Sequence, residues 1–274
     1  MYQSPSDQPV VLFLPAYDEE QSIVGVLSRV PATVAGRPVV PLVIDDGSVD
    51  RTGERARAEG ATVISLDRNR GLGAAVRRGL AEGLARDAAV IAFCDADGEY
   101  APEELAQVVE PVLAGRADYV VGSRFAGSID RMLLRRRAGN WLLTRALARL
   151  ARHPISDGQS GYRALSPVAA AAADIAHDFN YAQVLTLDLL AKGFEYEEVP
   201  ISYRFREQGR SFVRLVPYLR NVVPAVWRQR RQAEPARWSE PTRAESELGG
   251  GASARGPGIP ARSERRQGVK AVVG

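Results

Sequence analysis

Short apolar runs alternate with segments of helical periodicity through the first half of this 274-residue chain. Runs of five or six apolar residues predict strands that are covered on both faces, and the helices between them favour parallel pairing. The expected strands are 10–14, 39–44, 61–66, 89–94 and 118–122; the expected helices are about 19–30, 52–59, one that follows Gly71-Leu72-Gly73 and ends near Arg86, and 103–114. The pattern indicates an α/β fold with a mostly parallel sheet.

Acidic residues follow three of these expected strands. They are Asp18-Glu19, Asp45-Asp46 and Asp95-Ala-Asp97-Gly98-Glu99. Ligands of such sheets bind beyond the carboxyl ends of the strands, where all three clusters are expected. Asp95 and Asp97 can share one face if the chain keeps its pleat, and a turn at Gly98 can bring Glu99 alongside. Hard oxygen ligands suit Mg²⁺ or Mn²⁺, which also bind substrate phosphates. The pattern therefore predicts a metal site for phosphate-bearing substrates.

Composition and charge exclude several classes of protein. One cysteine excludes a disulfide framework or a Cys-based zinc site, and two scattered histidines exclude a His-rich metal cluster. The net charge of +3 arises in residues 228–274, which hold ten basic and five acidic residues. That segment is rich in Gly, Pro, Ser, Arg and Glu, so we expect a disordered basic tail and no nucleic-acid partner. The polar N-terminus and the lack of an 18-residue apolar run predict a cytoplasmic protein.

Two familiar loop patterns are not met. Gly71-Leu72-Gly73 would suit a dinucleotide-binding turn, but Val76 stands where G-x-G-x-x-G requires its third glycine. We interpret Gly71 as part of a close strand-to-helix turn near a nucleotide. The segment that begins at Asp95 is not a calcium loop, because an EF-hand places glycine sixth and glutamate twelfth.

Six motifs in order carry a family resemblance across about residues 9–227. They are Pro15-Ala-Tyr17-Asp18-Glu19, Asp45-Asp46-Gly47-Ser48-Val-Asp50-Arg-Thr52, Asn69-Arg-Gly71-Leu-Gly73-Ala, Asp95-Ala-Asp97-Gly98, Asp157-Gly-Gln-Ser160-Gly161-Tyr162-Arg163, and Glu198-Val-Pro200 with Arg206-x-x-Gly209-x-Ser211. The chain resembles glycosyltransferase family 2 on the GT-A fold, in the branch of dolichyl-phosphate mannose synthase and bacterial polyprenyl-phosphate sugar transferases.

The resemblance implies an architecture and a division of the chain. The expected fold is a three-layer α/β/α sandwich with a mostly parallel, Rossmann-like sheet and amphipathic C-terminal helices. One domain would cover 1–227, with a nucleotide-sugar half at about 9–124 and an acceptor half at about 125–227. Residues 228–274 would follow it as the basic tail.

The resemblance also assigns the donor site. A carboxylate can accept from a ribose hydroxyl, and an aromatic ring can pack on a base. The residues that inherit the nucleoside role are Pro15, Tyr17, Glu19, Asp45 and Asp46. The alternative for Asp45-Asp46-Gly-Ser is a plain turn with a helix N-cap. By the same resemblance, Asp95 and Asp97 are expected to bind the metal ion that bridges the donor diphosphate. Glu99 departs from the Gln often found there but remains an oxygen ligand, and Asp18 replaces the usual Asn.

The implied reaction is attack of an acceptor oxygen on the anomeric carbon, with inversion and loss of a nucleoside diphosphate. Arg124 and Arg206 are phosphate candidates, since a guanidinium contacts phosphate bidentately; the alternative for each is a surface salt bridge. A lipid phosphate needs no strong base, whereas a hydroxyl acceptor requires one, for which Asp157 is the candidate. The alternative for Asp157 is a structural cap of its turn. The remaining binding candidates are Ser160, Arg163 and Ser211.

Two basic amphipathic stretches favour a lipid acceptor. Residues 131–152 carry seven Arg, no acid, and Trp141 among leucines at helical spacing, and residues 212–227 repeat the pattern. Such segments predict contact with a membrane surface. The alternative is that both apolar faces pack on the sheet or on a second subunit.

We therefore expect a metal-dependent transferase, peripheral at the inner face of the membrane. It would move a hexose from a UDP- or GDP-sugar to a polyprenyl phosphate, with Mg²⁺ or Mn²⁺ as cofactor. A family 2 transferase with a soluble or cell-wall glycan acceptor stays open, as does a nucleotide-sugar-binding or scaffold protein. A membrane-protein partner or a homodimer is also left open.

Overall fold

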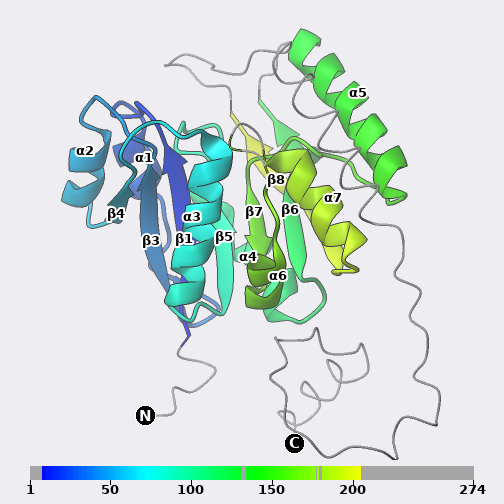
Figure 1. Ribbon diagram of the computed structural model, residues 1–274, viewed down its shortest axis with the longest axis horizontal. Helices are drawn as coiled ribbons and strands as arrows, with labels where there is room; N and C mark the ends of the chain where they lie inside the picture. Colours follow the sequence, from blue (N-terminus) through cyan, green and yellow to red (C-terminus); the bar gives the residue numbers. More distant parts are fainter. Residues whose placement is uncertain (1–7, 131–133, 177, 179–180, 205–274) are drawn as a thin grey trace, which may run out of the picture. The chain divides into compact units, whose positions relative to one another are not determined.

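A mixed sheet of eight strands carries helices on both faces (Figure 1). The computed structural model describes residues 8–130, 134–176, 178 and 181–204. In chain order the elements are β1 (Val10–Ala16), α1 (Ile23–Leu27), β2 (Thr33–Val34), β3 (Arg37–Asp45), α2 (Thr52–Ala58), β4 (Thr62–Ser65), α3 (Leu72–Ala85), β5 (Val90–Phe93), a 3-10 turn (Pro102–Glu104), α4 (Leu105–Leu113), β6 (Tyr119–Ile129), α5 (Leu134–Ala151), β7 (Arg163–Leu165), α6 (Pro167–Ala172), α7 (Ala182–Ala191) and β8 (Tyr196–Tyr203). The predicted α/β class is confirmed.

The apolar residues of β1 alternate between two core layers. Val10, Leu12 and Leu14 belong to a buried cluster that includes residues of α1, α2 and α4. Val11 and Phe13 belong to a second cluster, with residues of α3, α6 and α7. Because successive strand side chains point to opposite faces, a run that is apolar throughout is buried on both. The result is the expected three-layer sandwich.

The sheet is mixed: the short strand β2 pairs antiparallel with β3, four strands around β1 are parallel, and β7 is antiparallel to both of its neighbours. The strand order is β2-β3-β1-β5-β7-β6-β8, and β4 also pairs with β3. β1, β3, β4 and β5 run parallel, whereas β7 lies antiparallel between β5 and β6. β6 pairs with β8 in parallel. The loops after β1, β3 and β5 therefore leave one edge of the sheet together.

Several predicted boundaries are wrong. β1 continues through Pro15, because its pairing with β5 ends at Phe13 and Phe93, so the missing N–H of proline costs no bond to β5. The helix expected over 19–30 covers only α1, because residues before it bond to the loop after β3. β6 runs to Ile129, beyond the expected end at 122, after an irregularity in its pairing with β8 between Ser123 and Ser128.

The first basic stretch is largely helical, as α5. Thr144 and Leu147 are buried, whereas Trp141, Leu142 and Leu150 are exposed. The apolar side chains of α5 thus divide between the core and solvent instead of forming the one broad face expected. None of the described helices is both long enough and apolar enough to span a bilayer. The stretch 212–227 and the tail 228–274 lie outside the described residues.

Candidate functional site

The three acidic clusters lie at the same edge of the sheet, as predicted. Ala16 at the end of β1 is in register with Asp45 at the end of β3, and Phe13 is in register with Phe93, the last residue of β5. The loop after β5 therefore begins beside the loop after β1. Strand register, set by the buried apolar runs, brings residues 17–19, 45–46 and 95–99 to one place.

Hydrogen bonds join the loop after β1 to the loop after β3. The Asp18 N–H donates to Ser48 Oγ (3.0 Å), and Asp18 Oδ1 accepts from the Val49 N–H (3.0 Å). The Glu19 N–H donates to Thr52 Oγ1 at 2.8 Å. Asp18 has φ 53°, a left-handed conformation that Asn and Asp tolerate best among residues with a side chain. The Asn-to-Asp departure is therefore compatible with the turn, and the Asp18 carboxylate holds the neighbouring loop.

The carboxylates of Asp45 and Asp46 also hold loops. Asp45 accepts from the Ser48 N–H at 2.9 Å and from Ser65 Oγ at 3.1 Å. Asp46 accepts from the N–H groups of Arg70 and Gly71, both at 2.8 Å. Burial raises the pKa of Asp46 above its usual value, although the two N–H donors act in the opposite direction. The turn at residues 45–48, which was the alternative to a nucleoside site, is therefore present. Contact of Asp45 and Asp46 with a nucleoside stays a prediction.

Gly71 precedes α3 in a conformation suited to glycine. Its φ is 96°, and an added Cβ would lie 2.6 Å from the carbonyl oxygen of Asp178. The Gly73 N–H donates to that same oxygen at 2.6 Å. Gly71 therefore permits the close approach of the 178 backbone, while Asp46 holds its N–H, in agreement with the predicted strand-to-helix turn.

Asp95 is a half-buried carboxylate of the site, and its pKa is raised. Burial, followed by the nearby Glu99 carboxylate, raises the pKa of Asp95 to about 6, whereas Arg124 and Arg163 act to lower it. Asp97 Oδ1 accepts from the Glu99 N–H at 3.0 Å, which shapes the turn at Gly98 (φ 79°). A cation would relieve the repulsion between the Asp95 and Glu99 carboxylates. These hard oxygen donors therefore fit Mg²⁺ or Mn²⁺.

The predicted set of three protein ligands is not assembled. Within the part of the chain that is described, no three Asp, Glu, His or Cys side chains are grouped so as to hold a metal ion. Glu99 is 5% exposed, and its carbonyl oxygen accepts from the Arg204 N–H at 2.9 Å. Mg²⁺ is commonly held by one or two carboxylates together with substrate phosphates, so a complete protein cage is not required.

The loop before β7 lies directly against Asp95. An added Cβ on Gly161 would lie 2.3 Å from Asp95 Oδ2. The Gly161 N–H donates to the Tyr100 hydroxyl at 2.7 Å, and Tyr100 also forms an antiparallel bridge with Tyr203. Tyr100 was not among the residues singled out from sequence. The loops at 95–100 and 157–161 and the end of β8 thus converge.

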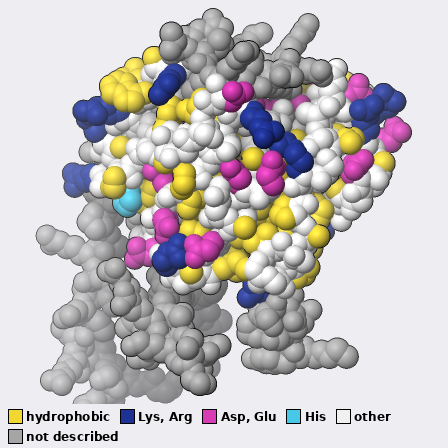
Figure 2. Space-filling model, turned by 180° about the vertical axis from the view of Figure 1, so that it is seen from behind, with side chains coloured by type: hydrophobic (Ala, Val, Ile, Leu, Met, Phe, Trp, Pro, Cys, Tyr) yellow, Lys and Arg dark blue, Asp and Glu magenta, His cyan; other side chains and the backbone are white. Residues whose placement is uncertain are grey.

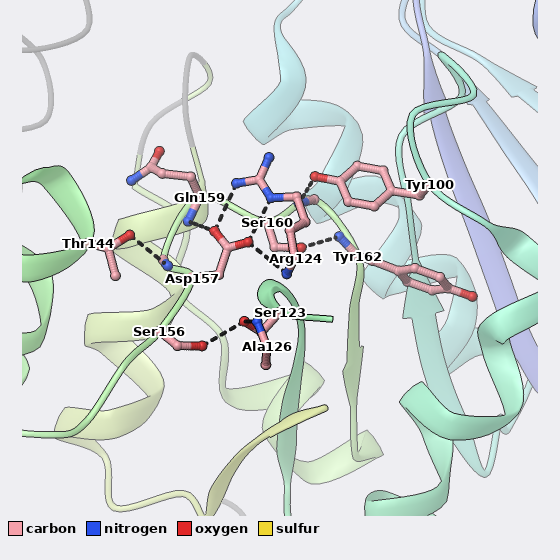
Figure 3. A network of polar contacts seen from close by, with 12 residues as sticks. Tyr100, Ser123, Arg124, Ala126, Thr144, Ser156, Asp157, Gln159, Ser160 and Tyr162 are labelled. Carbon is pink, nitrogen blue, oxygen red and sulfur yellow. Dashed lines mark hydrogen bonds and ion pairs between the residues drawn. The ribbon is translucent and has the colours of Figure 1, made fainter. Parts of the chain in front are cut away.

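Arg124 and Asp157 form a buried bidentate ion pair at this point. Arg124 Nε and Nη2 donate to the two carboxylate oxygens of Asp157 at 2.7 and 2.8 Å, and their side chains are 2% and 0% exposed (Figure 3). The Arg124 and Gln159 N–H groups donate to the same carboxylate. With four donors, Asp157 is built to orient Arg124 and its own turn. This geometry favours the cap alternative over the predicted general base.

Glu198 on β8 holds the backbone of residues 156 and 157, next to the ion pair. Its carboxylate accepts from the N–H groups of Ser156 and Asp157 and from the Tyr196 hydroxyl, at 2.8–3.1 Å. Glu198 appears in the Glu-Val-Pro motif but was not assigned a role from sequence. Its function in the structure is to fix the backbone that carries Asp157.

Arg163 lies fully buried beneath the same loop. Its guanidinium donates to the carbonyl oxygens of Ser160, Gly158 and Ala182 and to the hydroxyl groups of Tyr119 and Thr186. It also lies 5.2 Å from the centre of the Tyr181 ring. These contacts correct the prediction that Arg163 binds a ligand: its donors hold the loop to α7. Ser160 is buried as well, and its hydroxyl accepts from the Tyr162 N–H at 3.3 Å.

The other predicted residues are placed as follows. Pro15 is buried within β1, Tyr17 is half-buried beyond it, and Glu19 is 9% exposed and accepts from Ser22 Oγ at 2.8 Å. Gln183 is buried on α7. Arg206 and Ser211 lie outside the described residues, which end at Arg204 beside the 95–99 turn.

Comparisons with known proteins agree with this geometry. The model of the family described as Glycosyl transferase family 2 matches residues 11–170. Polyprenol monophosphomannose synthase of Mycolicibacterium smegmatis is 34% identical over 219 residues, covering 74% of this chain and 80% of that protein. Undecaprenyl-phosphate mannosyltransferase of Micrococcus luteus is 32% identical over 216 residues, covering 74% and 86%.

A solved structure shares the fold. Glucosyl-3-phosphoglycerate synthase from Mycobacterium tuberculosis, in complex with Mn²⁺, uridine diphosphate and phosphoglyceric acid, superposes with a TM-score of 0.67 at 24% identity. The alignment covers 81% of this chain and 78% of that chain. The likeness confirms the GT-A-like α/β architecture expected from the six motifs.

Proposed function

Because this chain belongs to glycosyltransferase family 2, as its motifs predicted, we propose that it transfers a hexose from a nucleoside diphosphate sugar to a polyprenyl phosphate. The observation that carries the proposal is the contact of Gly161 with Asp95. Gly161 lies in the loop that we assign to the acceptor. Asp95 is the carboxylate that we assign to the metal and the donor diphosphate, so the contact places the two binding regions side by side. Transfer needs both substrates within reach of one another, and this contact supplies that proximity.

The donor half would hold the nucleotide at the carboxyl edge of β1, β3 and β5. Tyr17 and Glu19 follow β1, whose last residue is in register with Asp45, and Asp45 and Asp46 fix the turn there, so the nucleoside would meet a preformed loop. Asp95 and Asp97 are the residues we assign to Mg²⁺ or Mn²⁺, together with the donor diphosphate. When bound, the ion would offset the charge that develops on the leaving diphosphate.

The acceptor half would act by positioning and charge. Asp157 holds the Arg124 guanidinium in a single orientation through two bonds, and a fixed cation favours the approach of a phosphate. A polyprenyl phosphate already carries an anionic oxygen, so it can attack without a strong general base. The engagement of Asp157 by four donors is compatible with that acceptor. Family membership supports inversion at the anomeric carbon.

The names of two relatives support a lipid-linked phosphate acceptor. The relative at 34% identity is named a polyprenol monophosphomannose synthase, and the relative at 32% identity is named an undecaprenyl-phosphate mannosyltransferase. Both names refer to a lipid and to mannose. The sugar and the base of the donor for this chain are therefore best sought first among GDP- and UDP-hexoses.

We propose that α5 lies on the membrane surface near the acceptor site. Trp141 is 59% exposed and Leu142 is 63% exposed, with arginines along the same helix. In Figure 2 hydrophobic and basic side chains gather together at the upper left, the side on which α5 lies. Tryptophan and arginine side by side suit the boundary between headgroups and acyl chains. Contact at the cytoplasmic leaflet belongs to the same proposal.

The proposal is tested with purified full-length protein, Mn²⁺ or Mg²⁺, an undecaprenyl phosphate and a panel of UDP- and GDP-hexoses, with products read by mass. A hexosyl lipid formed from one donor supports it. Sugar transfer to a soluble glycan with none to the lipid would overturn the acceptor assignment and retain the family chemistry. Donor binding without turnover on any acceptor would favour a nucleotide-sugar-binding protein.

A further inference from the structure

A basic hollow lies at the C-terminal end of α5, away from the carboxyl edge of β1, β3 and β5. It is a shallow depression, wide open to solvent, with a volume of about 430 Å³, and it is lined by Arg145, Ala148, Arg149, Arg152, His153 and Pro154. Every side chain of this lining that can carry a charge is basic. Arg145, Arg149 and Arg152 are four and three residues apart, so they project from one side of the helix end. We propose that this hollow binds the phosphate group of an anionic ligand.

Several exposed arginines elsewhere in this chain form ion pairs, whereas Arg145, Arg149 and Arg152 form none with the residues that the structure describes. Arg78 and Arg116, for example, each contact a glutamate carboxylate. Over the described residues, no carboxylate pairs with Arg145, Arg149 or Arg152; Arg145 instead lies over the Trp141 ring at 5.5 Å. Residues 131–152 contain no acid that could neutralise them. Three like charges around one hollow repel, and an anion between them removes that repulsion.

The backbone holds the third arginine in a costly conformation. Arg152 has φ 52°, and the His153 N–H closes the helix end by donating to the Ala148 carbonyl oxygen at 3.3 Å. Glycine or asparagine is the usual residue at such a helix end, because a larger side chain raises the energy of the left-handed conformation. An arginine at this position turns the chain and still adds its guanidinium to the hollow. Strain of this kind is commonly found at binding sites.

A phosphate offers more oxygens than a carboxylate, so it can be shared by more arginines. A guanidinium donates two parallel bonds to phosphate oxygens, and several arginines can share the oxygens of one phosphate. His153 completes the wall, with Nδ1 3.0 Å from the Pro154 carbonyl oxygen and its ring edge-on to Tyr196 at 5.2 Å. The ligand class is therefore a phosphate monoester, carried by a lipid headgroup or by a soluble molecule. The exposed Trp141 and Leu142, three to four residues before Arg145, favour the lipid source.

The test compares two full-length variants with the same change of charge. Arg145→Gln/Arg149→Gln removes two cations from the hollow and keeps good helix formers. Arg78→Gln/Arg116→Gln removes two exposed, ion-paired arginines elsewhere. Each protein is titrated calorimetrically with inorganic phosphate, and each is sedimented with phosphatidylcholine vesicles that contain phosphatidic acid or, at matched surface charge, phosphatidylglycerol. Circular dichroism verifies folding, and Ala148→Glu places a carboxylate in the hollow without removing an arginine.

We expect the hollow variant to lose about tenfold or more in affinity for the phosphate monoester, and the control to lose less than about threefold. Ala148→Glu is expected to weaken binding as well. Binding to phosphatidic acid vesicles that free phosphate displaces would identify a lipid source, whereas binding of inorganic phosphate alone would identify a soluble one. Equal losses in the hollow variant and the control, or no binding in either arm, would overturn the site. These readouts do not require sugar transfer, so they stand apart from the test of the enzyme.

Discussion

An added Cβ on Gly161 would lie 2.3 Å from Oδ2 of Asp95, so the backbone of one loop rests on a carboxylate of another. The two residues come from different halves of the chain. Gly161 precedes β7, which lies antiparallel beside β5, and Asp95 follows β5. Antiparallel pairing of these two strands places the start of one next to the end of the other. The contact is therefore a direct consequence of the antiparallel placement of β7 beside β5.

Gly161→Ala is expected to separate these loops. The methyl group has no room beside Asp95, so the loop or the carboxylate must move, which costs about 1–3 kcal/mol of stability. Misplacement of the reacting groups by about 1 Å can cost about 100-fold in rate. We expect kcat/KM to fall by about that factor while the protein stays folded. Gly139→Ala is the matched control, because no atom lies within 4 Å of a Cβ added there. Full activity in both variants would show that the contact between Gly161 and Asp95 is not needed for transfer.

The raised pKa of Asp95 predicts how stability depends on pH. With a folded-state pKa of about 6 against an ordinary 3.8, Asp95 favours the folded state below pH 4 and loses that contribution as pH rises through 6. Asp95→Asn should therefore raise the free energy of unfolding, by up to about 3 kcal/mol at pH 8, with the gain vanishing near pH 4. Urea denaturation without divalent metal measures the difference.

The exposed Asp87, before β5 at the opposite edge of the sheet, provides the control Asp87→Asn. It should show no comparable gain at pH 8. A gain of the same size in both variants, or none in Asp95→Asn, would show that Asp95 carries no such penalty. Below pH 6 protons also compete with a cation at Asp95, so the concentration of Mn²⁺ needed for half-maximal activity should rise.

The buried Arg124–Asp157 pair predicts strong coupling. Arg124→Gln and Asp157→Asn each leave one buried polar partner uncompensated, and each should cost about 3–5 kcal/mol of stability. The double variant should cost clearly less than the sum of the two, because neither charge is then left alone. Urea denaturation of the four proteins gives the coupling energy. Additive losses would mean that the ion pair does not hold these side chains.

Membrane contact through α5 is tested by removing its exposed apolar side chains. Trp141→Ser/Leu142→Ser should lower binding to phosphatidylglycerol-containing vesicles by about tenfold or more, since each large side chain that enters lipid contributes about 1.5–3 kcal/mol. Val168→Ser, at a 46% exposed position on α6, is the control. Co-sedimentation measures both variants. Equal vesicle binding by all proteins would leave α5 as a solvent-exposed helix.

Sequence was sufficient to place the acidic clusters but not to describe their bonds. Apolar runs that end at Asp45 and Asp95 determine where strands stop, and parallel pairing then puts those ends together. The partners of each carboxylate depend on loops far away in the chain. Asp46 holds the N–H groups of Arg70 and Gly71, and no local pattern around Asp46 indicates this.

Charged residues near the acceptor loop show the same limit. Because of their motif, Arg163 was predicted to bind a ligand and Asp157 to act as a general base. In the structure the guanidinium of Arg163 donates to protein groups, and the carboxylate of Asp157 accepts from them. Tyr100 was missed, and the signal for it was weak: an aromatic residue directly after the acidic turn. Whether a buried polar group serves a ligand or the fold depends on tertiary partners, which a motif does not specify.

The most direct test of the central claim is the yield of hexosyl undecaprenyl phosphate, measured by mass, for the wild type, Asp97→Asn and Asp87→Asn at saturating Mn²⁺. Asparagine keeps the shape of aspartate and removes the charge that a divalent ion and a diphosphate require. We expect product from the wild type and Asp87→Asn, and a loss of about 100-fold or more for Asp97→Asn. Undiminished lipid product from Asp97→Asn, or no lipid product from the wild type with any donor, would contradict the account.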